Sequence, residues 1–406
     1  MKNEPLVSVL ISYYNDRAFL QNAIDSVLKS TYTNFELFLV NHATTDDCRE
    51  IAHSYTDPRI VHMDMPYNIT VGGTGWIVGE FLKKAKGKYI KLFCADDMLR
   101  KDGLELLVDY MENHPEKDFA FGNMNYIDEN GKNLGANHFN VREGFSRDLN
   151  EVDAIRLYAK MLSVLPYPSS IAKKEIFDHL FINKALAYTF DVSLWCSLLC
   201  SGYKFGLIDK LVVDYRISKN QASSLEKQQR AFQVCGFEWH TFWNVFLLIK
   251  DIDLLKRVFP NNKYIGKVTR AEDIPFCIAT EFFTYYNYQF RVAAYLCLSD
   301  LLNNDEKRQY LEEQFGYTLR NLRLGCLGIF EENTKVEENT KVEEDVKDDK
   351  KELSGFKRFK TCLFQKTPKK LNIVELLFLF VRKVFISLNP IKSYRHKKKE
   401  KKQYNL

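Results

Sequence analysis

The sequence predicts an α/β fold, in which a mostly parallel sheet is flanked by helices and followed by a helical C-terminal extension. Short apolar runs alternate with segments of helical spacing through the first third of the chain, which is the pattern of strands joined by crossover helices. Two adjacent carboxylates, Asp96 and Asp97, close one of the apolar runs. Ligands of open α/β sheets bind at the carboxyl ends of strands, so this pair marks a candidate site.

The first apolar run begins at Val7 and leads into a polar turn, as expected of a buried strand. Apolar residues then recur at helical intervals from Leu20 to Leu28, and a polar segment interrupts them. The same alternation continues along the chain. The predicted elements are, in order, a strand from Val7, a helix over Phe19 to Lys29, a strand over Phe35 to Val40, a helix ending at Tyr55, a strand over Arg59 to Met63, a helix near Trp76 to Lys86, the strand that ends at Asp96-Asp97, and a helix over Gly103 to Asn113.

The carboxylates of Asp96 and Asp97 suit a hard divalent cation, Mg²⁺ or Mn²⁺, which can bridge to a diphosphate. The structural alternative is an aspartate pair that caps the helix beginning at Gly103. A third carboxylate, Asp191, stands in an apolar setting at a predicted helix start. It also has two interpretations, a general base or an ordinary N-cap.

Several segments of the chain resemble a family 2 glycosyltransferase of the GT-A fold, and they occur in the family's order. They are Val7-Ser8-Val9-Leu10-Ile11-Ser12-Tyr13-Tyr14-Asn15, Ala23-Ile24-Asp25-Ser26-Val27-Leu28, Asn34-Phe35-Glu36, Ala85-Lys86-Gly87-Lys88-Tyr89-Ile90, Phe190-Asp191-Val192-Ser193-Leu194-Trp195, Gly202-Tyr203-Lys204 and Asp214-Tyr215-Arg216. The resemblance covers about residues 5–225. It implies an inverting enzyme that takes a sugar from a nucleotide donor.

The resemblance also implies roles for individual residues. Asp97 corresponds to the residue that binds the metal directly, and Asp96 to its neighbour, which reaches the ribose or the metal. Asp191 corresponds to the catalytic base. Five further residues are expected at the nucleotide, with the Tyr14 ring stacked on the base. They are Ser12, Tyr14, Asn15, Asn41 and His42.

The chain departs from the family pattern at four places, and each departure weakens the donor-site inference without touching the fold. Two aspartates usually follow the second strand, where this chain has Asn41 and His42. An Ala-Arg-Asn motif of the family is replaced by residues 77–79, Ile-Val-Gly, which removes a phosphate contact that the resemblance implies. Cys94 stands where an acidic residue is frequent, so we expect weak metal binding without nucleotide; Ser218 replaces a histidine.

Composition excludes several classes of protein. The 406 residues carry a net charge of +5, and seven Lys/Arg against one Glu fall within residues 392–402. The rest of the chain therefore has no broad basic surface, and nucleic acid is not an expected partner. Nine scattered cysteines without a ligand-like spacing argue against zinc. The expectation is a cytoplasmic enzyme without a signal peptide.

Four domains are predicted: residues 1–225 as the catalytic domain, 226–330 as a helical extension, 331–352 as a charged linker, and 353–406 as an amphipathic helix with a basic tail. The apolar stripe of residues 371–388 is interrupted by charges, so an interfacial helix is favoured over a spanning one. With the basic cluster it predicts reversible binding to an anionic membrane surface, on the inner face of the cell membrane. The alternative is a stripe packed on the helical extension beside a solvated tail.

The function predicted from these observations is transfer of a sugar from a nucleotide-diphosphate donor to a glycan or lipid-linked acceptor, in the synthesis of a bacterial surface polysaccharide. One alternative is a catalytically decayed subunit of a membrane-bound glycan assembly complex, motivated by Asn41, His42, Val78 and Gly79. Another is a nucleotidyltransferase, which shares the sheet and the metal but would need a glycine-rich phosphate loop that the first turn lacks.

Overall fold

The computed structural model describes residues 4–69, 74–141, 146–218, 228–285, 287–328 and 330. Residues up to Gly316 form one compact unit, and those from Tyr317 on belong to a second one. The predicted linker 331–352 and the predicted amphipathic helix and basic tail 353–406 lie outside the described residues, as does the boundary predicted at 225/226. Among the described residues, no helix has both the length and the apolar character needed to cross a membrane.

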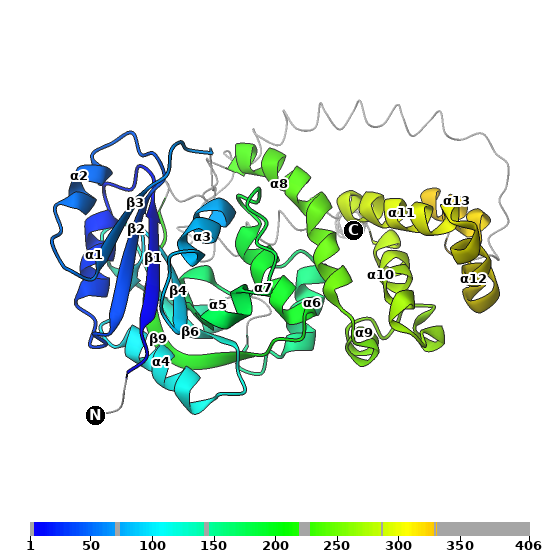
Figure 1. Cartoon of the computed structure of the whole chain (residues 1–406), viewed down its shortest axis with the longest axis horizontal. Coiled ribbons are helices and arrows are strands. Elements are labelled where there is room, and N and C mark those ends of the chain that lie inside the picture. Colours follow the sequence, from blue (N-terminus) through cyan, green and yellow to red (C-terminus); the bar gives the residue numbers. More distant parts are fainter. Residues whose placement is uncertain are drawn as a thin grey trace, which may run out of the picture. The chain divides into compact units, whose positions relative to one another are not determined.

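The first unit is built on a mixed sheet, which runs β3-β2-β1-β4-β8-β6-β9-β5 with β7 paired to β6 (Figure 1). Its strands are β1 (Val7–Tyr13), β2 (Phe35–Asn41), β3 (Ile60–Asp64), β4 (Tyr89–Cys94), β5 (Met98–Leu99), β6 (Phe119–Ile127), β7 (Asn133–Asn137), β8 (Ser170–Lys173) and β9 (Phe205–Arg216). The four strands from β3 to β4 are parallel. Strand β8 then pairs antiparallel with both β4 and β6, while β6 and β9 are parallel. The predicted α/β class is confirmed, and the predicted parallel order holds in the N-terminal half.

Helices cover both faces of the sheet in the catalytic part. They are α1 (Leu20–Leu28), α2 (Cys48–His53), α3 (Thr74–Leu82), α4 (Gly103–Asn113), α5 (His138–Val141), α6 (Glu151–Ala159) and α7 (Phe190–Cys200), with short 3₁₀ helices η1 (Tyr167–Ser169) and η2 (Lys174–Phe177) beside β8. The predicted bounds of α4 are confirmed, and α1 is one residue shorter at each end than expected.

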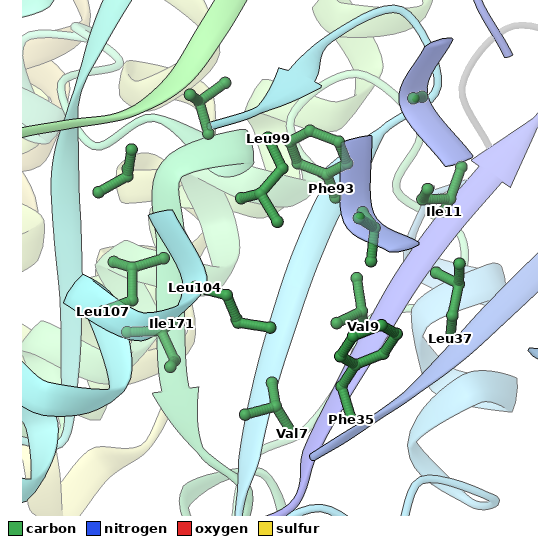
Figure 2. Close-up of a cluster of buried hydrophobic side chains, with 14 of the residues drawn as sticks. Val7, Val9, Ile11, Phe35, Leu37, Phe93, Leu99, Leu104, Leu107 and Ile171 are labelled. Atoms are coloured by element: carbon green, nitrogen blue, oxygen red, sulfur yellow. The ribbon is translucent and has the colours of Figure 1, made fainter. Parts of the chain in front are cut away.

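The core of the sheet follows directly from the alternation of side chains along each strand. Odd-numbered residues of β1, among them Val9, point to the face covered by α1 and α4 (Figure 2). They pack there with Leu37 and Leu104. The opposite face is closed by α3, where the rings of Phe38 and Phe81 meet edge to face at 5.0 Å. Because both faces are buried, the parallel strands are apolar on both sides, which explains their continuous apolar runs.

A helical extension follows β9. It contains α8 (Gln228–Phe242), η3 (Trp243–Leu248), α9 (Ile252–Val258), η4 (Ile265–Lys267), η5 (Ala271–Asp273), α10 (Ile274–Phe283), α11 (Tyr288–Asn303) and α12 (Asp305–Phe315); α13 (Leu319–Cys326) belongs to the second unit. Buried aromatic rings hold the extension together, for example Phe246 against Phe282 at 4.7 Å and Phe282 against Phe290 at 5.0 Å. Most of the aromatic residues are therefore core, as predicted, although Phe237 and Tyr288 are exposed. The extension packs on the catalytic part through η3 against α7 and α9 against α6.

Candidate active site

The carboxyl ends of β1, β2 and β4 lie side by side and bring together the residues that follow them. Ser12 pairs with Val40 on one side and with Cys94 on the other. The predicted nucleotide residues and the predicted metal ligands therefore share one edge of the sheet, although they come from three separate segments. The structure thus creates the candidate site by sheet register alone.

Asp97 is almost completely buried, at 1% exposure. Its Oδ1 atom accepts a hydrogen bond from the backbone N–H of Arg216 at 2.8 Å, while Oδ2 has no hydrogen-bond partner among the described residues. Burial and the charge of Asp96 raise the pKa of Asp97 well above its usual range. A buried carboxylate oxygen without a donor is costly unless a ligand satisfies it. This oxygen is therefore the strongest sign of a bound group at the site.

Arg216 holds the turn that carries the two aspartates. Its Nε atom donates to the backbone carbonyl of Asp96 at 2.8 Å, and its Nη1 atom donates to the carbonyls of Asp128 and Glu129 at 3.0 Å each. The guanidinium also lies over the ring of Phe19, 4.6 Å from its centre. The side chain is buried, so these contacts hold the Asp96-Asp97 turn in one position.

The residues present fit a hard divalent cation. Potential ligand atoms of Cys94, Asp96 and Asp97 all lie within 4.8 Å of one another, and two of the three are carboxylates. Burial, and then the charges of Asp97 and Asp96, raise the pKa of the Cys94 thiol well above its ordinary value, so this thiol stays protonated and is a weak ligand. The alternative of a helix cap is wrong for this pair, because the N-cap of α4 is Asp102.

Two of the predicted nucleotide residues also shape the loop after β2. Asn15 adopts a left-handed conformation, with φ 55°, and its Oδ1 accepts from the backbone N–H of Thr45 at 3.0 Å. Asn41 is buried, donates to Asp64 at 2.9 Å and accepts from the backbone of Thr44 at 2.8 Å. Both amides are thus engaged in holding the loop, and their predicted contact with a nucleotide stays a prediction.

His42 is buried beneath an aromatic surface. Its Nε2 atom accepts a hydrogen bond from the backbone N–H of Ile69 at 3.2 Å, and burial lowers the pKa of the ring. A neutral imidazole that accepts at Nε2 carries its proton on Nδ1, which makes that atom a donor. The ring meets Tyr14 and Trp76 edge to face, and Trp76 in turn packs on Tyr67 at 4.9 Å. Tyr14 is 40% exposed, so its ring is open to a planar ligand.

Asp191 lies at the start of α7, as predicted, but it is not the N-cap. That position belongs to Thr189, and Asp191 is the second residue of the helix. The charge of Asp191 is among the causes, after burial and the nearer aspartates, that raise the pKa of Cys94. The α7 start therefore lies close to the Asp96-Asp97 turn, although about a hundred residues separate them in sequence.

Sequence reasoning missed two residues of this region. Lys91 is fully buried in β4, where its ammonium donates to the carbonyls of Leu92 and Pro168, and burial lowers its pKa to about 7. The hydroxyl of Tyr167 is buried without a hydrogen-bond partner among the described residues. Burial, and then the charges of Cys94 and Asp191, raise the pKa of Tyr167. The sequence signal for Lys91 was a lysine within an otherwise apolar strand. No sequence signal pointed to Tyr167.

The chain is similar in sequence to a known protein family and to several known proteins. Residues 8–181 match the family described as "Glycosyl transferase family 2". An uncharacterized glycosyltransferase of Methanocaldococcus jannaschii is 27% identical over 271 residues, which cover 66% of this chain and 86% of that protein. The Bacillus subtilis protein named "Putative teichuronic acid biosynthesis glycosyltransferase TuaG" is 24% identical over 223 residues, or 54% of this chain and 82% of that one.

Two solved structures are also similar to this chain. The crystal structure of S. aureus TarS 1-349 in complex with UDP-GlcNAc superposes with a TM-score of 0.47 at 14% identity, covering 80% of this chain and 89% of that one. The mannosyltransferase PcManGT from Pyrobaculum calidifontis, in complex with GDP-Man and Mn²⁺, gives a TM-score of 0.45 at 14% identity, covering 80% and 87% of the two chains.

Proposed function

We propose that this chain is a member of glycosyl transferase family 2 with a GT-A-like fold, and that it transfers a sugar from a nucleotide-diphosphate donor to a glycan or lipid-linked acceptor with inversion. The observation that carries the proposal is the unpaired, buried Oδ2 atom of Asp97 at the carboxyl edge of the sheet. A second carboxylate lies beside it in Asp96, and a third, Asp191, is contributed by α7.

Each of these residues has a distinct task in the proposed reaction. Asp97 and Asp96 would hold Mg²⁺ or Mn²⁺, which when bound neutralises charge on the departing diphosphate. Arg216 keeps the turn of the two aspartates in place through the backbone carbonyl of Asp96. Asp191 accepts the proton of the acceptor hydroxyl as that oxygen attacks the anomeric carbon. A single base with direct attack gives inversion of the configuration.

The nucleotide is proposed to lie over the ends of β1 and β2. Tyr14 offers an exposed ring for stacking on the base, and His42 offers its Nδ1–H beneath the same surface. Ser12, Asn15 and Asn41 border this position from the two strands. The ligand that this geometry supports is a nucleoside diphosphate with a sugar attached.

The proposed biological role is the synthesis of a bacterial surface polysaccharide at the inner face of the cell membrane. Its support is the likeness to the B. subtilis protein named for teichuronic acid biosynthesis. The basic segment 392–402 supports attachment to anionic lipid, although it lies outside the described residues.

The test is nucleotide binding by calorimetry, with and without Mn²⁺, after a thermal-shift screen of nucleotide sugars such as UDP-glucose, UDP-N-acetylglucosamine and GDP-mannose. The wild-type chain should bind the selected donor in a metal-dependent manner, and Asp97→Ala should abolish this dependence and the turnover. Full turnover of Asp97→Ala in excess chelator would exclude the metal site. Absence of donor binding by the wild type would instead favour the decayed subunit suggested by Asn41, His42, Val78 and Gly79.

A further inference from the structure

Helix α8 of the helical extension carries a buried carboxylate, Glu238, which binds the segment just before α7. This carboxylate accepts hydrogen bonds from the backbone N–H groups of Ala187 at 2.6 Å, Tyr188 at 3.0 Å and Thr189 at 2.8 Å. It also accepts from the hydroxyl of Thr189 at 2.9 Å. One side chain of the extension thus collects four donors from three successive residues of the catalytic part.

These donors are the ones that the local chain leaves without a partner. The first N–H groups of a helix and of the turn before it have no carbonyl within the helix to bind. Thr189 is the N-cap of α7, yet its side chain caps no N–H group of the helix. Its hydroxyl donates to Glu238 instead. A residue distant in sequence therefore accepts from the backbone N–H of the N-cap residue, as the acidic residue of a capping box does, and a negative charge at this end of a helix is favourable.

The candidate base, Asp191, comes directly after the segment that Glu238 binds. Asp191 is two residues beyond Thr189, in the first turn of the same helix, so the segment held by Glu238 determines where Asp191 stands. The thiol of Cys235, one turn before Glu238 on α8, also lies near Asp191. Its pKa is raised to about 12 by burial and then by the charges of Glu238 and Asp191. The face of α8 that carries Cys235 and Glu238 therefore lies against the start of α7.

We propose that Glu238 is a positioning residue for sugar transfer, which holds the start of α7 so that Asp191 stays at the site of Asp96 and Asp97. The inference rests on the proposed role of Asp191 as the base. It makes the helical extension part of the catalytic apparatus, because a residue of the extension binds the N-cap residue of the helix that carries the base. Removal of these hydrogen bonds should lower turnover and leave donor binding intact.

The test uses the full chain and hydrolysis of the donor selected by the thermal-shift screen, with water as the acceptor. Glu238→Gln places an amide nitrogen against backbone donors, and kcat should fall about 10-fold while the donor Kd stays within about 3-fold. Thr189→Val, which removes one of the four donors, is a milder second variant with an expected loss of about 3-fold. The matched control is Asp273→Asn, another buried carboxylate of the extension, whose contacts to Arg270 and Tyr310 lie within the extension.

A merely structural role predicts that Glu238→Gln and Asp273→Asn lower the melting temperature alike and leave kcat of the folded protein unchanged, which would overturn the proposal. The decisive measurement is a double-mutant cycle with Asp191→Asn. If Glu238 acts through Asp191, Glu238→Gln should have little further effect once the base is absent. An equal loss in both backgrounds would refute the inference while the proposed function stands. Turnover of Asp191→Asn within a few-fold of wild type would refute the base assignment itself.

Discussion

Replacement of Lys91 by methionine should remove one contribution to the pH dependence of stability around the candidate site. The ammonium is fully buried, and burial lowers its pKa from 10.5 to about 7. Because the pKa in the folded chain lies below that in the unfolded chain, the unfolded chain binds more protons between these two values. Lys91 therefore destabilises the fold most at low pH, and the free-energy cost of burying it falls as the pH rises from about 7 to 10.5.

The magnitude follows from the same two values. A fall of the pKa from 10.5 to about 7 corresponds to a cost of about 5 kcal/mol for the charged form, and about 2 kcal/mol of this cost disappears between about pH 7 and pH 9. Lys91→Met removes that cost but leaves the carbonyl of Pro168 without its donor, which costs about 2 kcal/mol. The variant should thus be about 2 kcal/mol more stable than wild type near pH 7 and about equal near pH 9.

The assay is urea denaturation followed by tryptophan fluorescence, at several values between about pH 6 and pH 9. Loss of the lysine also raises the pKa of Asp97 further, which shifts the difference in the same direction. Lys84→Met, on the exposed side of the turn after α3, is the control and should show no change of the difference with pH. A constant difference between Lys91→Met and wild type over the whole range would refute a buried, titrating lysine.

Three further predictions concern the donor site and the membrane. Tyr167→Phe removes a buried hydroxyl that has no partner among the described residues, so the free energy of unfolding should rise by about 1 kcal/mol; turnover should fall about 10-fold if the hydroxyl meets the substrate, and unchanged turnover would exclude that contact. His42 donates through Nδ1 and should favour a base with an acceptor at N3, as in cytosine; competition among UDP, CDP and GDP tests this, and a UDP preference that is unchanged in His42→Asp would dismiss it. The full chain should float with anionic liposomes at low salt and partly detach at high salt, whereas a chain ending at Glu352 should not float; equal behaviour of the two would refute the anchor.

The sequence was sufficient for the parts of the fold that depend on local pattern. The alternation of apolar residues predicted β1, α1 and the bounds of α4, because strand and helix periods repeat within a few residues. The aspartate pair was expected at a strand end, and the structure places it in the turn that follows β4. The site residues from β1, β2 and β4 could be grouped in advance because parallel strands end at one edge.

Contacts between distant segments were not predictable in this way. Nothing near Lys91 in the sequence shows that a carbonyl 77 positions later accepts a hydrogen bond from its side chain. Nothing near Glu238 shows that it binds the N-cap residue of a helix about fifty residues before it. The order of the C-terminal strands also depends on such contacts, because β8 inserts between β4 and β6 and pairs antiparallel with both. Buried polar groups are satisfied wherever the tertiary fold brings a partner, and local periodicity carries no information on that partner.

The charges at the site explain why a nucleotide diphosphate and a cation should bind together. Asp97 is buried beside Asp96, and this environment raises the pKa of Asp97 and favours its protonated form. A cation must therefore displace that proton, so metal affinity should fall as the pH is lowered. Cys94 adds no charge because its thiol stays protonated, and the buried Lys91 opposes a second positive charge nearby. Two carboxylates alone would hold a divalent ion weakly here, and a diphosphate would supply the missing oxygen ligands and negative charge. The donor would then supply part of its own binding site, and Cys94, at a position where the family resemblance implies an acidic residue, would couple metal binding to the donor.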